Sequence, residues 1–160
     1  MFSDDHQVLL NKAMELEKKG DPNSALNIYK DLVKVFPRVP ALYFNMGNIS
    51  FDGNDYHSAK KHFEKAIEID SNFKEAHFNL GNTLKKIDEV SSSAYHFERS
   101  IQIDPEFESA YFNLANLAKE KNKFLTAIRN YKETLRISPD NYVARSNLVF
   151  TYMKKVKSLF

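Results

Sequence analysis

The sequence predicts an all-α fold, a right-handed solenoid of antiparallel helix pairs, and two observations carry this prediction. Asparagine recurs at a spacing of 34 residues, at Asn11, Asn45, Asn79, Asn113 and Asn147. Around each asparagine the sequence repeats without insertion or deletion, with two stretches of helical periodicity in every full copy. A unit of this kind cannot bury its apolar face alone, so neighbouring units must stack and share a core.

This register divides the chain into four full units and the first helix of a fifth. We expect an N-terminal tail at 1–5, repeats at 6–39, 40–73, 74–107 and 108–141, and a terminal helix at 142–160, all in a single structural domain. In the first unit, Asp21 can cap the second helix and Pro22 occupies its first position. Second helices end before Pro37, Pro105 and Pro139, because proline disfavours helical backbone in the residue before it.

Both helices of a unit show a packing side. In the first helix, Met46, Gly47 and Ser50 share one side and recur in register. In the second helix, a small residue is followed four residues later by an aromatic ring. The four pairs are Ala25 and Tyr29, Ala59 and Phe63, Ser93 and Phe97, and Ala127 and Tyr131. The small residue lets the helices approach and the ring fills the space beside it.

Composition restricts the class of protein. Hydrophobic residues make up 42% of the chain and charged residues 28%, which is typical of a folded domain. The net charge is only +2 with scattered basic residues, so we expect no nucleic-acid partner. No uncharged apolar stretch approaches the roughly 18 residues of a membrane-spanning helix, and no secretory signal opens the chain. We therefore expect a cytoplasmic protein without a membrane partner.

Catalytic and metal-binding patterns are missing from the sequence. There is no cysteine, and the four glycines do not form a phosphate-binding loop. The five histidines show no metal-ligand spacing, and His62 and His96, which share a register, are interpreted as surface or wall residues. We predict a protein that is not an enzyme and that has no cofactor and no metal.

These positions resemble the tetratricopeptide repeat (TPR). Gly47, Ala59, Phe63 and Ala66 match its pattern in the second unit, and Gly81, Phe97 and Pro105 match it in the third. The terminal units depart from it, with Lys12, Arg145 and Val149 at positions where other residue types are expected. The resemblance implies that first helices line a concave groove and second helices form the outer wall.

The predicted peptide-binding residues lie on the first helices, opposite the packing side. A carboxamide can pair with both a backbone N–H and a C=O, so a row of asparagines could hold an extended peptide. A similar asparagine row is known in the repeat arm of O-linked N-acetylglucosamine transferases, but inherited repeat consensus would also explain it. The row comprises Asn45, Asn48, Asn79, Asn82, Asn113 and Asn116.

Two further sets of side chains stand beside this row. Phe44, Phe78 and Phe112 could anchor ligand side chains or pack against the next unit. Lys85, Lys86 and Lys119 could favour acidic ligands or form a solvated helix face. In the last helix, an apolar stripe predicts an oligomer or domain contact. It consists of Val149, Tyr152, Val156, Leu159 and Phe160.

The predicted function is a non-enzymatic scaffold or adaptor that binds an extended peptide or a partner protein in the groove. One alternative is the substrate-binding arm of a larger enzyme, such as a glycosyltransferase. Another is a structural oligomerisation unit, and the apolar stripe makes a homodimer through the last helix one possible form of self-association.

Overall fold

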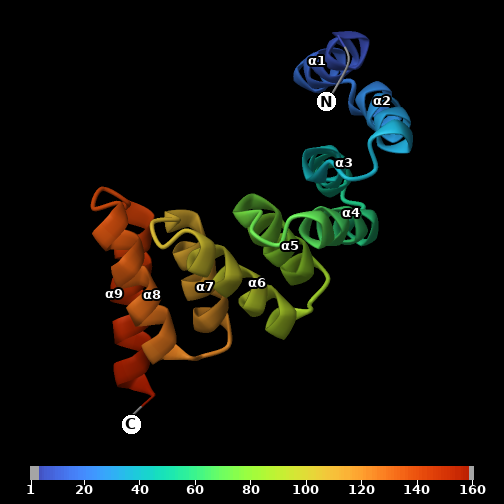
Figure 1. The fold of residues 1–160 in the computed structure, drawn as a ribbon. Helices are drawn as coiled ribbons and strands as arrows, with labels where there is room; N and C mark the ends of the chain where they lie inside the picture. Colours follow the sequence, from blue (N-terminus) through green and yellow to red (C-terminus); the bar gives the residue numbers. More distant parts are fainter. Residues whose placement is uncertain (1–3, 159–160) are drawn as a thin grey trace.

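A computed structural model describes residues 4–158, and this part of the chain consists of nine α-helices without a strand. Figure 1 shows them following one another in a curved row, with the two termini at opposite ends. The all-α prediction is confirmed. The helices are α1 (Asp4–Lys18), α2 (Pro22–Val35), α3 (Pro40–Asp52), α4 (Tyr56–Ile69), α5 (Lys74–Lys86), α6 (Val90–Ile103), α7 (Glu108–Glu120), α8 (Phe124–Ile137) and α9 (Tyr142–Lys157).

The helices pack in chain order. Within a unit the first helix packs on the second, as α3 does on α4, and each second helix packs on the first helix of the next unit. The first helices α3, α5 and α7 begin at Pro40, Lys74 and Glu108, so the spacing of 34 residues in the sequence is also the spacing of the structure. Helix α1 begins at Asp4, two residues before the expected start of the first repeat at His6.

The turn inside each unit uses one residue with left-handed backbone. Gly20, Asn54, Asp88 and Asn122 occupy the same register and have φ between 55° and 79°. Glycine, asparagine and aspartate tolerate this region better than other residues. The residue directly after the left-handed one then donates its backbone N–H to a carbonyl in the last turn of the helix, for example from Asp55 N to Ser50 O at 2.9 Å. Asp21 caps α2 by accepting from Ser24 N, as the sequence predicts.

The core is a row of small residues facing aromatic rings. Gly47 lies against Phe63 and Gly81 against Phe97, so closely that an added Cβ would stand 2.5 Å and 2.7 Å from the nearest ring atom. The rings themselves are fully buried. This contact sets how closely the two helices of a unit approach.

Candidate functional site

The asparagines of the periodic row bond to the unit before them. Asn79 Nδ2 donates to Asn48 Oδ1, and Asn113 Nδ2 donates to Asn82 Oδ1, both at 2.8 Å. The same contact recurs from α9 at 3.3 Å between Asn147 Nδ2 and Asn116 Oδ1. We call the surface formed by Asn45, Asn48, Asn79, Asn82, Asn113 and Asn116 the asparagine face. Its side chains therefore join neighbouring first helices.

Each of the two central pairs keeps a free donor and a free acceptor. Asn48 Nδ2 and Asn82 Nδ2 donate to no group in the described chain, and Asn79 Oδ1 and Asn113 Oδ1 accept from none. All four residues are half-buried. A donor and an acceptor are thus presented together at each step from one unit to the next.

Tyrosines of the second helices hold the two ends of this face. Asn45 Nδ2 donates to the Tyr29 hydroxyl at 3.2 Å, and that hydroxyl donates to Glu17. At the other end the Tyr131 hydroxyl donates to Asn116 Oδ1. Burial, reinforced by Glu17, raises the pKa of Tyr29, and burial also raises the pKa of Tyr131. Both hydroxyls therefore remain protonated donors at neutral pH.

The three phenylalanines beside the asparagines make their aromatic contacts within the protein. Each is half-buried and meets the ring of its own unit's second helix, and two also meet a ring that precedes the next first helix. The centroid distances are 5.8 Å for Phe44–Phe63, 4.9 Å for Phe44–Phe73, 5.8 Å for Phe78–Phe97, 5.0 Å for Phe78–Phe107 and 6.1 Å for Phe112–Tyr131. The rings thus close the seam between units.

The lysines near this face are partly engaged. Lys85 Nζ pairs with Glu120 at 2.7 Å, and Lys119 Nζ donates to Asn147 Oδ1 at 3.0 Å. Lys86 is exposed and lies over the Tyr56 ring, outside any ion pair in the described chain. Because Lys85 and Lys119 already bind groups of the protein, we expect a weaker preference for acidic ligands than the sequence suggests.

A hollow of about 370 Å³ lies on the asparagine face across three first helices. It is lined by Glu17 of α1, by Asn48, Phe51 and Asp52 of α3, and by Asn79 and Asn82 of α5. Two carboxylates and no basic side chain contribute to it. This part of the face is therefore acidic, a property that the sequence pattern alone does not indicate.

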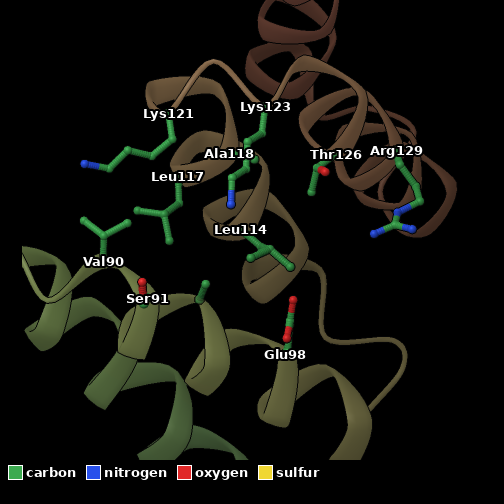
Figure 2. A pocket seen from close by; sticks show the side chains of 11 residues that line it. Val90, Ser91, Glu98, Leu114, Leu117, Ala118, Lys121, Lys123, Thr126 and Arg129 are labelled. Carbon is green, nitrogen blue, oxygen red and sulfur yellow. The ribbon is translucent and has the colours of Figure 1, made fainter.

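A second hollow, of about 290 Å³, lies away from the predicted site residues. Figure 2 shows Val90 and Glu98 of α6, Leu114 of α7 and Arg129 of α8 around it. The small residues Ser91 and Ala94 leave room there between the second helices. It contains none of the asparagines, phenylalanines or lysines predicted to bind peptide.

His96, one of the two histidines interpreted as surface or wall residues, is half-buried on the second helix α6 and contacts a histidine of the first helix α5. His77 is buried, and its Nδ1 lies 2.9 Å from Nδ1 of His96, while its Nε2 contacts Ser71 O at 3.2 Å. Burial lowers the pKa of both imidazoles, that of His96 to about 4. No group of three or more His, Cys, Asp or Glu side chains among the described residues could hold a metal.

The predicted contact residues of the last helix lie on the surface of α9. Val149, Tyr152 and Val156 are all exposed. Leu159 and Phe160 lie outside the described residues. None of the helices in the described range is both long and apolar enough to span a membrane.

Comparison with known proteins identifies the repeat. Two family models match, described as TPR repeat over residues 47–88 and as tetratricopeptide repeat over residues 96–129. The chain therefore contains tetratricopeptide repeats. Human tetratricopeptide repeat protein 6 is 31% identical over 64 residues. That match covers 40% of this chain and only 12% of the human protein.

Solved structures of TPR proteins are similar over nearly the whole chain. MamA from Desulfovibrio magneticus RS-1 superposes with a TM-score of 0.88 and 20% identity, over 97% of this chain and 88% of that one. YrrB, described as a TPR protein with an unusual peptide-binding site, has a TM-score of 0.80 and 20% identity, over 92% and 76% of the two chains. At these identities the likeness shows the fold, and it confirms the TPR solenoid.

Proposed function

We propose that this TPR protein is a non-enzymatic scaffold that holds an extended segment of a protein partner along its asparagine face. One observation carries the proposal. The Asn48–Asn79 and Asn82–Asn113 hydrogen bonds leave one amide N–H and one amide C=O of each pair free, at successive steps along the row.

These groups complement a polypeptide main chain. Every residue other than proline offers one backbone N–H and one C=O, and both need partners when a ligand is desolvated. Asn48 Nδ2 can donate to a ligand carbonyl, and Asn79 Oδ1 can accept from a ligand amide. Because side chains of the ligand take no part in these bonds, recognition would depend little on its sequence. The peptide-binding site named for YrrB, a structure with the same fold, supports this use of the scaffold.

The acidic hollow would add selectivity at one end of the face. Glu17 and Asp52 lie beside the free amide groups of Asn48 and Asn79. Carboxylates without a neighbouring cation attract basic side chains. We therefore expect a lysine or arginine of the ligand to lie over α1, α3 and α5.

The test replaces only the free donors. In the double variant Asn48→Asp and Asn82→Asp, each Oδ1 can still accept from Asn79 or Asn113, while the ligand-facing N–H is lost. A random-peptide library is selected on the immobilised protein, and a recovered peptide is titrated by calorimetry. Two hydrogen bonds of about 0.5–1.5 kcal/mol each predict an affinity loss of roughly five-fold to more than a hundred-fold.

A matched control separates a lost donor from added charge. Asn27→Asp introduces the same change on the exposed surface of α2 and should leave affinity unaltered. Repeating the titration at about 0.5 M salt screens the new charges, and the loss caused by missing hydrogen bonds should persist. Wild-type affinity in the double variant would show that the row serves only to join the units.

A further inference from the structure

Helix α9 carries an apolar face on the side directed away from the protein. Val149, Met153 and Val156 follow one another at spacings of four and three residues, so they form one stripe, and each is more than half exposed, at 57%, 57% and 54%. Ala144 and Thr151, on the opposite side of the helix, are fully buried. An exposed stripe of this kind marks an interaction surface.

A shallow pocket lies within this face. It measures about 480 Å³ and is lined by Arg145, Ser146, Val149, Phe150 and Met153. An adjoining hollow of about 230 Å³ places Phe150 beside Lys119, Lys154 and Glu120. The surface therefore offers space for apolar side chains, with basic groups at its edges.

The stripe does not suit another second helix of the kind found in this chain. Val149 occupies the register of Gly47, Gly81 and Ala115, which face the rings of α4, α6 and α8. Even a single Cβ at Gly47 would stand 2.5 Å from Phe63, and valine adds two methyl groups beyond that carbon. A helix that presents an aromatic ring at this point cannot approach α9 as α4 approaches α3.

The charge of α9 indicates which kind of partner could bind its exposed face. Helix α9 contains Arg145, Lys154, Lys155 and Lys157 and no aspartate or glutamate. Lys154 Nζ lies 5.5 Å from the centroid of the Phe150 ring, at the edge of the apolar face. Of the acidic groups near the helix, Glu120 pairs with Lys85, Glu108 accepts from Asn141, and Asp140 precedes the helix. Two copies of α9 packed together would juxtapose like charges without compensating carboxylates.

We propose that the exposed face of α9 binds an acidic amphipathic helix of a partner protein. Apolar residues of the partner at helical spacing would enter the pocket beside Val149 and Met153, as in other complexes that place a helix in an apolar groove. Carboxylates along its rim would pair with Arg145, Lys154 and Lys157. This surface is separate from the asparagine face and does not depend on it.

The experiment uses two synthetic helical peptides with the same leucine stripe, one with a glutamate rim and the other with a lysine rim. Fluorescence anisotropy measures the affinity of each for the intact chain. The acidic peptide should bind about tenfold more tightly at about 50 mM salt, and the difference should shrink at about 500 mM. The double variant Lys154→Glu and Lys157→Glu should reverse the preference, and Met153→Ala should weaken both peptides about fivefold.

Matched variants on α8 serve as controls. Lys132→Glu reverses the charge of an exposed lysine and Leu125→Ala shortens an exposed apolar side chain, and both should leave the two affinities unaltered. Equal affinities for the two peptides, or an unchanged preference in the charge-reversal variant, would overturn the proposal. Sedimentation velocity supplies a further outcome. A wild-type dimer that Met153→Ala dissociates would show that a second copy, and not an acidic helix, occupies the face.

Discussion

At the scale of single residues, the pair of His77 and His96 links stability to pH. Their Nδ1 atoms are 2.9 Å apart, so one imidazole must accept from the other and at least one must be neutral. Burial lowers the pKa of His96 to about 4 from the ordinary value of 6.5, helped by His77 and Lys60. Burial, with a smaller effect of Arg99, also lowers the pKa of His77.

Replacing His96 should reduce the pH dependence of stability. Between pH 6.5 and about 4 the unfolded chain binds a proton that folded His96 does not, so stability falls as pH drops through this window. Asn130 occupies the equivalent position in the next unit, so asparagine is a suitable replacement. His96→Asn should remove about 1–2 kcal/mol of the stability that the protein loses between about pH 7 and pH 5. Urea unfolding at the two pH values measures this.

The control for that change is His57→Asn, because His57 is exposed on the neighbouring second helix. This variant should keep the wild-type pH dependence. Part of the dependence should also persist in His96→Asn, since burial lowers the pKa of His62 and His77 as well. An unchanged difference between the two pH values in His96→Asn would contradict the assignment.

At the scale of helices, the approach of α3 to α4 depends on the absence of a side chain at Gly47. Phe63 fills the space so completely that a Cβ would come within 2.5 Å of its ring. At the same register Val149 of α9 is 57% exposed to solvent. One position therefore distinguishes a helix that must accept a partner closely from one that presents an open face.

Gly47→Val should destabilise the protein. The added atoms must displace Phe63 or separate α3 from α4, and overpacking of this kind costs about 1–3 kcal/mol. That exceeds the gain from removing glycine from a helix. The midpoint of urea unfolding should fall accordingly, whereas Ala41→Val at an exposed position of the same helix should change it little. A wild-type midpoint in Gly47→Val would refute the packing argument.

At the scale of the whole molecule, equivalent units make equivalent contacts with their neighbours. The hydrogen bond from Asn79 to Asn48 recurs from Asn113 to Asn82, and both measure 2.8 Å. The contact surface between one unit and the next is therefore the same at successive steps along the array. Stability in such an array is approximately a sum over units and the interfaces between them.

Deletion of residues 74–107 should leave a folded, shorter solenoid. It removes one period, so Asn113 takes the place of Asn79 opposite Asn48 and the core register is preserved. Circular dichroism should show a helical protein that still unfolds cooperatively, with lower total stability because one unit and one interface are lost. A coil spectrum for this deletion would contradict the additive description.

The sequence by itself determined the repeat and the helices. The period of 34 residues, the small and aromatic pairs such as Ala59 and Phe63, and the helix cap Asp21 are local or periodic signals, and each appears in the structure at the position that the sequence predicts. Such signals suffice because helix periodicity and backbone preference act within a few residues.

Only the tertiary structure decided what the side chains on these helices contact. The sequence could not tell that Asn79 would bond to Asn48, that Lys85 would pair with Glu120, or that His77 would be buried against His96. In the first two cases the partners belong to different units, and in the third to the two helices of one unit. Their meeting depends on how closely and at what angle the helices pack. That geometry arises from the summed shape of many buried side chains, which no single stretch of sequence specifies.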